Sequence, residues 1–310
     1  MSRASLRRSC LAVPASSPKM LAKAASLPAD QVFIDLEDAV APIEKTDATR
    51  QNAVDALTGQ SWVARTKAVR VNDARSRWCF RDIAYIVERA AADLDAIMLP
   101  KAESAGDVHF VDRLLTQLEG ELGLSRRIGI EVQIEGPRGL MEIEAIAAAS
   151  DRVETLIFGP GDFAAAIGMP QLSVGATDPG YAGDQWHYVL WKILVTARAF
   201  GLQAIDGPYS QIRDLDGFRE VAERSRSLGF DGKWAIHPDQ VALCNEIFSP
   251  TPEAYARAVR ILEAYSQATG TDRLGAAVFE GEMIDEASRK MAEQVAARGR
   301  AAGLDRAEHA

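Results

Sequence analysis

Short apolar runs alternate along the chain with longer stretches in which apolar residues recur at helical spacing. The runs are rich in Val, Ile, Leu or Phe, and most end at Pro, Gly, Asn or Asp, which is typical of buried parallel strands. Eight runs have this character: Leu11–Pro14, Gln31–Val40, Ala68–Asn72, Asp95–Lys101, Ile128–Glu135, Thr155–Asp162, Leu202–Pro208 and Lys233–Pro238. The pattern therefore predicts eight buried strands.

The stretches between these runs predict helices. Ala105–Leu118 places its apolar residues at i, i+3 and i+4 spacing, which forms one stripe. Arg138–Ala149 follows Pro137, a residue that suits a helix start, and Gln185–Phe200 and Gln211–Leu228 have a similar pattern. Strands that alternate with helices indicate a parallel sheet, and eight βα units are the number that closes a barrel.

The C-terminal part departs from this alternation. Pro252–Thr269 and Glu282–Arg300 both have a helical pattern and are additional to the eight units. We expect an α/β fold: a (β/α)8 TIM barrel in residues 1–248 and a C-terminal helical extension in residues 249–310. From the pattern alone, the extension is either packing on the outside of the barrel or a functional segment.

Composition and charge narrow the class of protein. The chain has 310 residues and a net charge of -9, which argues against a general nucleic-acid binder because phosphate contacts need a basic surface. Cys10, Cys79 and Cys244 are far apart and form no CxxC pair, so we interpret them as reduced thiols. No signal peptide and no run of about 18 apolar residues is present. We expect a cytoplasmic protein that does not engage a membrane.

Charged residues gather where the predicted strands end, which is the functional face of such a barrel. Glu135 and Asp162 close successive strands, about one βα unit apart. Two close carboxylates repel unless a cation lies between them, and hard oxygen ligands suit Mg²⁺. The alternative is a pair of solvated strand ends, or an ion pair with a nearby arginine.

Two further residues stand out among the apolar strands. Arg70 lies within such a strand and needs an anion, which is either Glu37 or Asp38 in a structural ion pair or the carboxylate of a ligand. His237 is more consistent with a hydrogen-bonded structural residue than with a general base or a zinc ligand, because no other His or Cys stands at a metal-ligand spacing. There is no GxSxG elbow, Walker loop or GxGxxG.

Taken together, these segments resemble the citrate lyase β-subunit-like CoA ester lyases of the aldolase/citrate lyase superfamily. The resemblance runs from about Arg8 to about Gln294. It is carried, in this order, by RSCLAVPASSPKMLAKA, FIDLEDAVAPIEK, AVRVN, MLPKAES, QIEGPRGLMEIEAIAAAS, LIFGPGDFAAAIG, AIDGPY, GFDGKWAIHP and GAAVFEGEMIDEA.

The resemblance implies a site for Mg²⁺, or Mn²⁺, held by Glu135 and Asp162. It implies that Arg70 binds and polarises a 2-oxo acid and that Asp285, in the tail motif GEMID, is the acid/base. It further implies a homotrimer in which the C-terminal extension acts as a lid on the site of a neighbouring subunit. Two other sets of residues follow from it: Glu37 and Asp38 behind the metal, and Lys19 and Lys23 near the phosphates of coenzyme A.

The implied activity is that of a carbon–carbon lyase of the EC 4.1.3 type. Such an enzyme cleaves, or forms by condensation, a 3-hydroxyacyl-CoA such as malyl-CoA or citramalyl-CoA. The products are acetyl-CoA and a 2-oxo acid, glyoxylate or pyruvate. The aromatic segment Asp178–Trp191 resembles the malyl-CoA and citramalyl-CoA branch.

One departure and three alternatives remain open. Many members of the group read IET and then AxG where this chain has Glu135-Gly136-Pro137-Arg138-Gly139, so residues that line the small-acid pocket differ. The alternatives are a malyl-CoA thioesterase, a citrate lyase β subunit that acts on a carrier-bound thioester, and a non-catalytic acyl-CoA sensor or structural oligomer. Retention of Glu135, Asp162, Arg70 and Asp285 together argues against the last.

Overall fold

The computed structural model describes residues 6–178, 180–270 and 275–305 of the chain. These residues form two compact units, Met1–Glu246 and Ile247–Ala310. The first unit holds the predicted barrel, and the second unit begins at the last residue of helix α10 (Pro238–Ile247). Each unit is described in turn.

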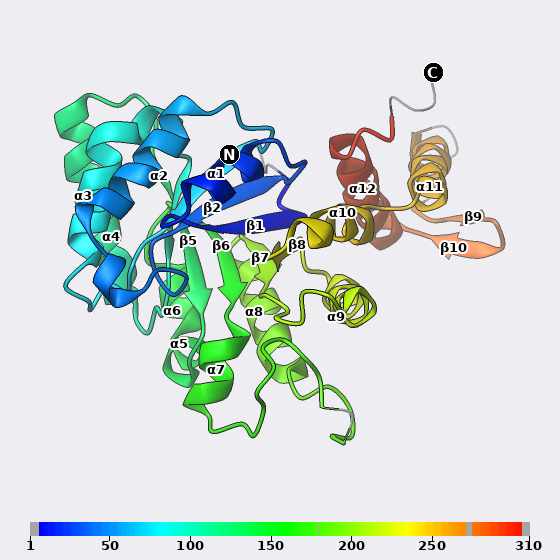
Figure 1. Cartoon of the computed structure of the whole chain (residues 1–310). Helices are drawn as coiled ribbons and strands as arrows, with labels where there is room; N and C mark the ends of the chain where they lie inside the picture. Colours follow the sequence, from blue (N-terminus) through cyan, green and yellow to red (C-terminus); the bar gives the residue numbers. More distant parts are fainter. Residues whose placement is uncertain (1–5, 179, 271–274, 306–310) are drawn as a thin grey trace. The chain divides into compact units, whose positions relative to one another are not determined.

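The first unit is a closed barrel of parallel strands, as the sequence predicts (Figure 1). The strands follow one another around the barrel, and β1 pairs with β8 to close it. Each predicted run overlaps one strand. From β2 to β8 the strand ends before the run does, because the polar residues at the run's end belong to the following loop, and β1, β3, β6 and β8 begin one or two residues before their runs. The bounds are β1 Ser9–Pro14, β2 Gln31–Asp35, β3 Thr66–Arg70, β4 Ala96–Leu99, β5 Gly129–Ile134, β6 Val153–Phe158, β7 Gln203–Asp206 and β8 Gly232–Ala235.

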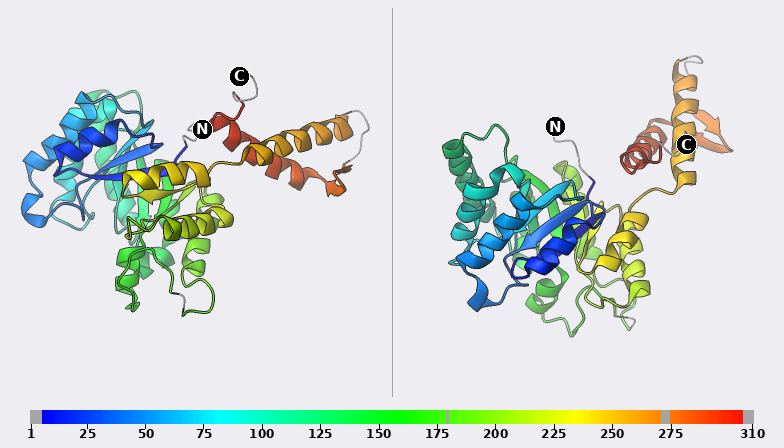
Figure 2. Two further views of the ribbon diagram at one scale, coloured as in Figure 1. Left: turned by 45° about the vertical axis from the view of Figure 1, so that its right-hand side comes forward. Right: turned by 45° about the horizontal axis from the view of Figure 1, so that its top comes forward.

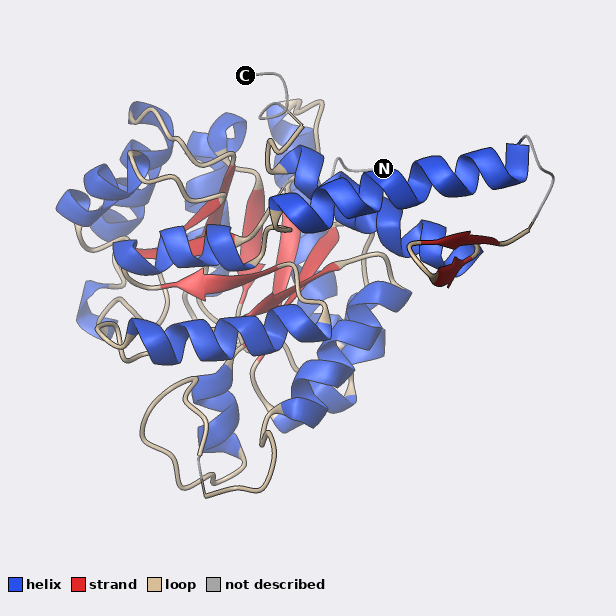
Figure 3. Cartoon of the chain, turned by 90° about the vertical axis from the view of Figure 1, so that its right-hand side faces the viewer, coloured by secondary structure: helices blue, strands red, loops and turns tan. Residues whose placement is uncertain are grey.

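Helices cover the outer surface of these strands (Figure 3). The predicted helix Arg138–Ala149 is instead two short helices, because the backbone leaves the helical region at Glu142. Besides α10, the helices of this unit are α1 Pro18–Ala25, η1 Pro42–Glu44, α2 Asp47–Gly59, α3 Cys79–Ala90, η2 Ala91–Asp93, α4 Ala105–Leu122, α5 Pro137–Met141, α6 Ile143–Ala147, α7 Pro160–Ala166, α8 His187–Ala199 and α9 Leu215–Leu228.

The interior of the barrel is filled by side chains that alternate along each strand. Its apolar layer consists of Cys10, Phe33, Ala68, Ala96, Met98, Ile157, Ile205 and Trp234. Because side chains of a strand point alternately inward and outward, Asp35 and Arg70 share the inner face with Phe33 and Ala68. The two-residue period of the strands thus points the side chains of these two charged residues into the barrel.

The second unit contains α11 Pro252–Gly270, the hairpin β9 Ala277–Phe279 and β10 Glu282–Ile284, and α12 Glu286–Ala301. Figure 2 shows α11 beside α12. The predicted helix Glu282–Arg300 is therefore wrong at its start. Glu280 and Gly281 both have positive φ, of 50° and 83°, which is the geometry of a two-residue hairpin turn.

A small core joins the two helices of this unit. Tyr255 and Ala258 of α11 pack against Ala292 and Ala296 of α12. Gly299 is needed here, since a Cβ atom would lie 2.2 Å from the ring of Tyr255. Across the described parts of both units, the helices are too short or too polar to traverse a bilayer.

Candidate active site

The carboxyl ends of the strands surround a cavity of about 510 Å³. Asp35 and Arg70 line it from β2 and β3, Glu135 from the end of β5, and Asp162 from α7, while Trp234 of β8 forms part of its wall. The structure thus brings together Arg70, Glu135 and Asp162, which the sequence singled out. It also places Asp35, Gln133 and Trp234 in the cavity wall and Lys101 beside Glu135 and Asp162, although the sequence reasoning assigned none of these four.

Arg70 is held by a carboxylate on the neighbouring strand. Asp35 is its register partner, and it accepts hydrogen bonds from Arg70 Nε at 2.8 Å and Nη2 at 2.6 Å. The guanidinium carbon lies 5.2 Å from the centre of the Trp234 ring. Burial alone would lower the pKa of Arg70, but Asp35 and Glu37 raise it, so the guanidinium keeps its charge.

Glu135 is a buried carboxylate whose charge is only partly compensated. Its Oε1 accepts a hydrogen bond of 2.6 Å from the backbone N–H of Lys101, and its Oε2 accepts a long one of 3.4 Å from Gln133. Burial raises the pKa of Glu135 to about 8 even though Arg70 and Lys101 oppose that effect. A carboxyl group of this kind ionises readily only when a cation comes close.

Asp162 stands in the first turn of α7, after Gly159. A Cβ atom on residue 159 would lie 2.3 Å from Cβ of Glu135, so only glycine lets the two segments approach this closely. Asp162 is half-exposed, and its Oδ2 lies 3.7 Å from Lys101 Nζ. The two proposed metal ligands therefore line one cavity.

Glu37 and Asp38 lie on the loop after β2. Glu37 is buried, with Oε2 at 3.2 Å from Arg70 Nη1, whereas Asp38 is exposed and lies 3.8 Å from the same nitrogen. Burial raises the pKa of Glu37 to about 7, against the opposing effect of Arg70. Both carboxylates also contact Lys101 Nζ. The main anion of Arg70 is therefore Asp35, which the sequence reasoning did not consider, and Glu37 and Asp38, which it did, make the longer contacts.

The donor set fits a divalent cation. Within the described residues, Gln133 Oε1 is buried and accepts no hydrogen bond, and Gln133 adjoins Glu135. Glu37 Oε2 accepts no hydrogen bond either, but it is ion-paired with Arg70. An orphaned acceptor beside a buried carboxylate favours a cation or ordered water there. No group of three or more His, Cys, Asp and Glu side chains in the described chain could hold a metal, but Mg²⁺ usually takes one or two protein carboxylates.

Three other residues that the sequence singles out lie outside this cavity. Lys19 and Lys23 are exposed, one turn apart on α1, which follows the carboxyl end of β1. His237 accepts a 3.3 Å hydrogen bond at Nδ1 from the backbone N–H of Asp239, within its own turn. The structural reading of this histidine therefore fits its surroundings.

Asp285 belongs to the second unit, where it caps the N-terminus of α12. Its Oδ1 accepts a hydrogen bond of 3.0 Å from the backbone N–H of Ser288. That bond lowers the pKa of Asp285. A general base is more effective when its pKa lies near the working pH, so the acid/base role requires surroundings beyond those that the unit itself provides.

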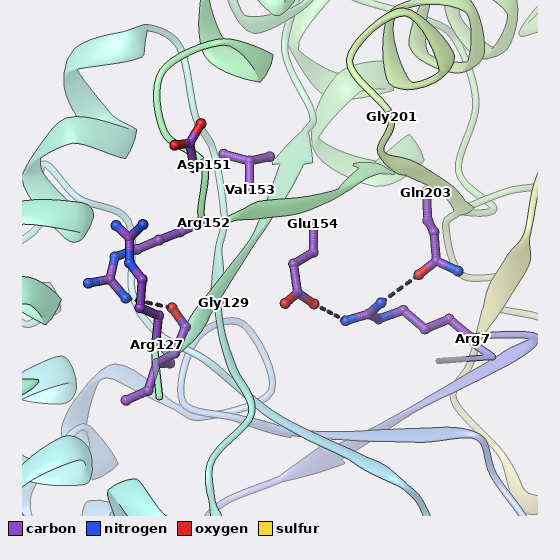
Figure 4. Close-up of a pocket in the computed structure, with 10 residues that line it drawn as sticks. Arg7, Arg127, Gly129, Asp151, Arg152, Val153, Glu154, Gly201 and Gln203 are labelled. Carbon is purple, nitrogen blue, oxygen red and sulfur yellow. Dashed lines mark hydrogen bonds and ion pairs between the residues drawn. The ribbon is translucent and has the colours of Figure 1, made fainter. Parts of the chain in front are cut away.

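A second cavity, of about 480 Å³, lies at the opposite, amino ends of the strands. Figure 4 shows Arg7 between Glu154 and Gln203, both of which it contacts. Arg7 Nε also donates to Gln31 at 2.8 Å and to Glu131 at 2.9 Å. The central charge of this cavity, Arg7, thus has four polar side-chain partners, so the size of the cavity alone does not mark a binding site.

Comparison with known proteins decides the family. Residues 8–238 match the HpcH/HpaI aldolase/citrate lyase family. The chain belongs to this family. The resemblance drawn from the sequence is thereby confirmed, and so is the barrel fold.

Individual members of the family are similar over nearly the whole chain. An L-malyl-CoA/beta-methylmalyl-CoA lyase of Cereibacter sphaeroides is 40% identical over 291 residues, which cover 91% of each chain. A malyl-CoA/beta-methylmalyl-CoA/citramalyl-CoA lyase of Chloroflexus aurantiacus is 33% identical over 277 residues, 84% of this chain and 78% of that one. The crystal structure of CitE from Mycobacterium tuberculosis in complex with magnesium, acetoacetate and coenzyme A has a TM-score of 0.75 at 30% identity, and the match covers 95% of this chain and 98% of that one.

Proposed function

We propose that this family member is a Mg²⁺-dependent CoA ester lyase that cleaves or forms a 3-hydroxyacyl-CoA such as malyl-CoA or citramalyl-CoA. The observation that carries the proposal is the cavity in which buried Glu135, half-exposed Asp162 and fully charged Arg70 converge. Relatives at 40% and 33% identity bear the names of such lyases. A 2-oxo acid is an anion with a carbonyl oxygen next to its carboxylate, and it needs both a cation and a guanidinium.

Glu135 and Asp162 would hold the metal, which when bound supplies a Lewis acid for the oxygens of the 2-oxo acid. Arg70, fixed by Asp35, would stabilise negative charge on the oxo oxygen as the carbon–carbon bond forms or breaks. Because Asp35 already fixes its orientation, little reorganisation is needed when that charge develops. Lys19 and Lys23 would lie near the phosphates of coenzyme A.

Asp285 would move the proton at the acetyl carbon. In the condensation direction its carboxylate takes a proton from the methyl group of acetyl-CoA, and the carbanion attacks the carbonyl carbon of glyoxylate or pyruvate. The resulting alkoxide takes up a proton from solvent to become the hydroxyl group, which gives this proton up again in cleavage. In cleavage, the same carboxyl group returns the proton to the thioester enolate. Enclosure of Asp285 by a closing lid would remove water and offset the effect of its N-cap hydrogen bonds.

We further propose a cytoplasmic homotrimer in which residues 249–310 complete the site of a neighbouring subunit. Support comes from the second unit, which is compact by itself and carries Asp285. Mixing Glu135→Gln and Asp285→Ala subunits tests this arrangement. Exchange of lids predicts that about one quarter of the sites regain both residues after random reassembly. Mixtures that stay inactive would place Asp285 in the site of its own subunit or in none.

The proposed reaction is tested with malyl-CoA and citramalyl-CoA, each with and without Mg²⁺, by following 2-oxo acid and free thiol together. We expect 2-oxo acid that depends on the metal from one of the substrates. Thiol without 2-oxo acid would identify a thioesterase. The absence of both products would contradict the proposal and favour a carrier-bound thioester or a non-catalytic role.

A further inference from the structure

Lys101 occupies a backbone position that disfavours a lysine. Its φ is 51°, in the left-handed region, where glycine and asparagine are the usual residues. The strain is retained although a glycine would relieve it, which indicates that the side chain at this position has a use. Lys101 directly follows Pro100 at the end of β4, on the functional face of the barrel.

The ammonium group of Lys101 lies among several carboxylates. Glu37 Oε1 accepts a hydrogen bond from Nζ, and Asp38 accepts two, of 3.1 and 3.3 Å. Asp162 Oδ2 lies farther away, at 3.7 Å, beyond hydrogen-bond distance. The side chain of Lys101 therefore binds the loop carboxylates Glu37 and Asp38 and leaves Asp162 without a direct hydrogen bond from it.

The backbone of the same residue acts on a different carboxylate. The left-handed φ directs the N–H of Lys101 to Glu135 Oε1 at 2.6 Å. This bond fixes one oxygen of Glu135 and leaves Oε2 with only the long contact to Gln133. One residue thus orients Glu135 through its backbone and occupies Glu37 and Asp38 through its side chain.

We propose that Lys101 is a positioning residue that sorts the acidic side chains of the cavity. Its ammonium group keeps Glu37 and Asp38 from serving as metal ligands, so that a divalent cation binds through Glu135 and Asp162. Without this ammonium group, the cavity would carry more uncompensated negative charge. A metal would then bind more tightly, but through Glu37 and Asp38 as well as through Glu135 and Asp162. The inference rests on the metal site of the proposed function and adds the residue that selects its ligands.

Direct Mn²⁺ binding, followed by the electron paramagnetic resonance signal of free Mn²⁺ without any acyl-CoA, tests this role. Lys101→Met removes a positive charge next to the carboxylates, so Mn²⁺ affinity rises on the order of tenfold. Lys101→Arg keeps the charge and stays within about twofold of the native protein. Lys67→Met is the matched control, since Lys67 pairs with Asp93 at the other end of the barrel and its loss leaves Mn²⁺ affinity unchanged.

The origin of the tighter binding is tested by adding Glu37→Gln and Asp38→Asn. These changes weaken Mn²⁺ binding more in the Lys101→Met background than in the native background, because only there do the two side chains become ligands. Equal losses of Mn²⁺ affinity in both backgrounds would contradict the proposal that Lys101 selects the metal ligands. Turnover of Lys101→Met falls while its metal site stays filled, which a simple loss of metal would not produce.

Folding is controlled by a second variant. Lys101→Gly removes the ammonium and relieves the left-handed backbone, and it also tightens Mn²⁺ binding. Circular dichroism shows whether the two variants are folded. The inference would be wrong if a folded variant did not bind Mn²⁺ more tightly than the native protein. If the native protein has no lyase activity but Lys101→Met still binds Mn²⁺ more tightly, only the lyase proposal is contradicted. If the native protein is an active lyase but Lys101→Met does not bind Mn²⁺ more tightly, only the inference on Lys101 is contradicted.

Discussion

The two ends of the barrel both contain buried charges and a cavity of similar volume, about 510 Å³ at the carboxyl ends and 480 Å³ at the amino ends. At the amino ends, both oxygens of Glu131 accept hydrogen bonds, one from Arg7 at 2.9 Å and one from Gln31 at 2.7 Å. At the carboxyl ends, Glu135 has one good donor and one distant one.

This difference separates a structural network from a binding site. Burial raises the pKa of Glu131 as well as that of Glu135, so neither burial nor a shifted pKa distinguishes the two ends. The distinguishing property is the number of polar groups left for a ligand to satisfy. We therefore expect changes at the amino ends to affect stability, and changes at the carboxyl ends to affect activity.

The largest expected effect is that of Glu135→Gln. Turnover of the proposed lyase reaction should fall on the order of 10³-fold, because the substituted amide is a poor ligand for the metal. Mn²⁺ binding should be lost, whereas the free energy of unfolding of the metal-free protein should not decrease, since burial already disfavours the charge of this carboxyl group. Steady-state kinetics, Mn²⁺ binding and urea denaturation measure the three quantities. An active but destabilised Glu135→Gln variant would contradict the assignment of activity to the carboxyl ends of the strands and of stability to the amino ends.

Arg7→Met is the counterpart at the amino ends. Loss of the guanidinium leaves Glu131 buried without its cation, which should lower the free energy of unfolding by about 3 kcal/mol. Turnover at saturating substrate should stay within about twofold at a temperature where the variant is folded. Adding Glu131→Gln should restore part of the stability. An unchanged melting temperature with reduced activity would show that this end is not merely structural.

Asp285→Ala tests the residue that belongs to neither end of the barrel. Turnover should fall about 10²-fold or more, as expected for loss of a general acid/base, with Mn²⁺ binding unchanged. Asp285→Asn is the matched variant, because it retains an N-cap acceptor for α12 while removing the base. Full activity of Asp285→Ala would exclude the assigned role.

The smallest expected effect is on the pH dependence of stability. The pKa values of Glu37, about 7, and Glu135, about 8, lie above the ordinary value of 4.5, so the folded protein binds more protons than the unfolded chain between these limits. The free energy of unfolding of the metal-free protein should therefore fall by about 1 kcal/mol or more as the pH rises from roughly 5 to 8. Urea denaturation in EDTA measures this slope. Glu135→Gln should reduce it, and an equal slope in that variant would assign the effect elsewhere.

Much of the barrel was accessible from the sequence because its signals are local. Apolar runs with polar ends predicted every strand of the barrel. Arg70, Glu135 and Asp162 stand at those ends, so the rule that parallel strands end at one face brought them together. The roles of Asp285, Lys19 and Lys23 came from the resemblance alone and stay predictions.

The features that the sequence did not predict depend on contacts between distant segments. Asp35 was not recognised as the partner of Arg70 because that pairing is set by the register of β2 against β3. The left-handed backbone of Lys101, which directs its N–H to Glu135, was not predicted because lysine rarely adopts this conformation. The hairpin before α12 was missed because Glu280-Gly281 is a weaker turn signal than Asn-Gly.

Gly159 has a consequence for how such chains are recognised among uncharacterised sequences. Acidic residues at a given spacing often arise by chance. Gly159 is a stricter requirement, because Glu135 packs so closely against it that even a methyl group would not fit. A survey that requires glycine at this position as well as both acids would discard chains that have the ligands without the space to assemble them. In a natural variant, an alanine at position 159 is expected to disrupt the site as loss of Glu135 does.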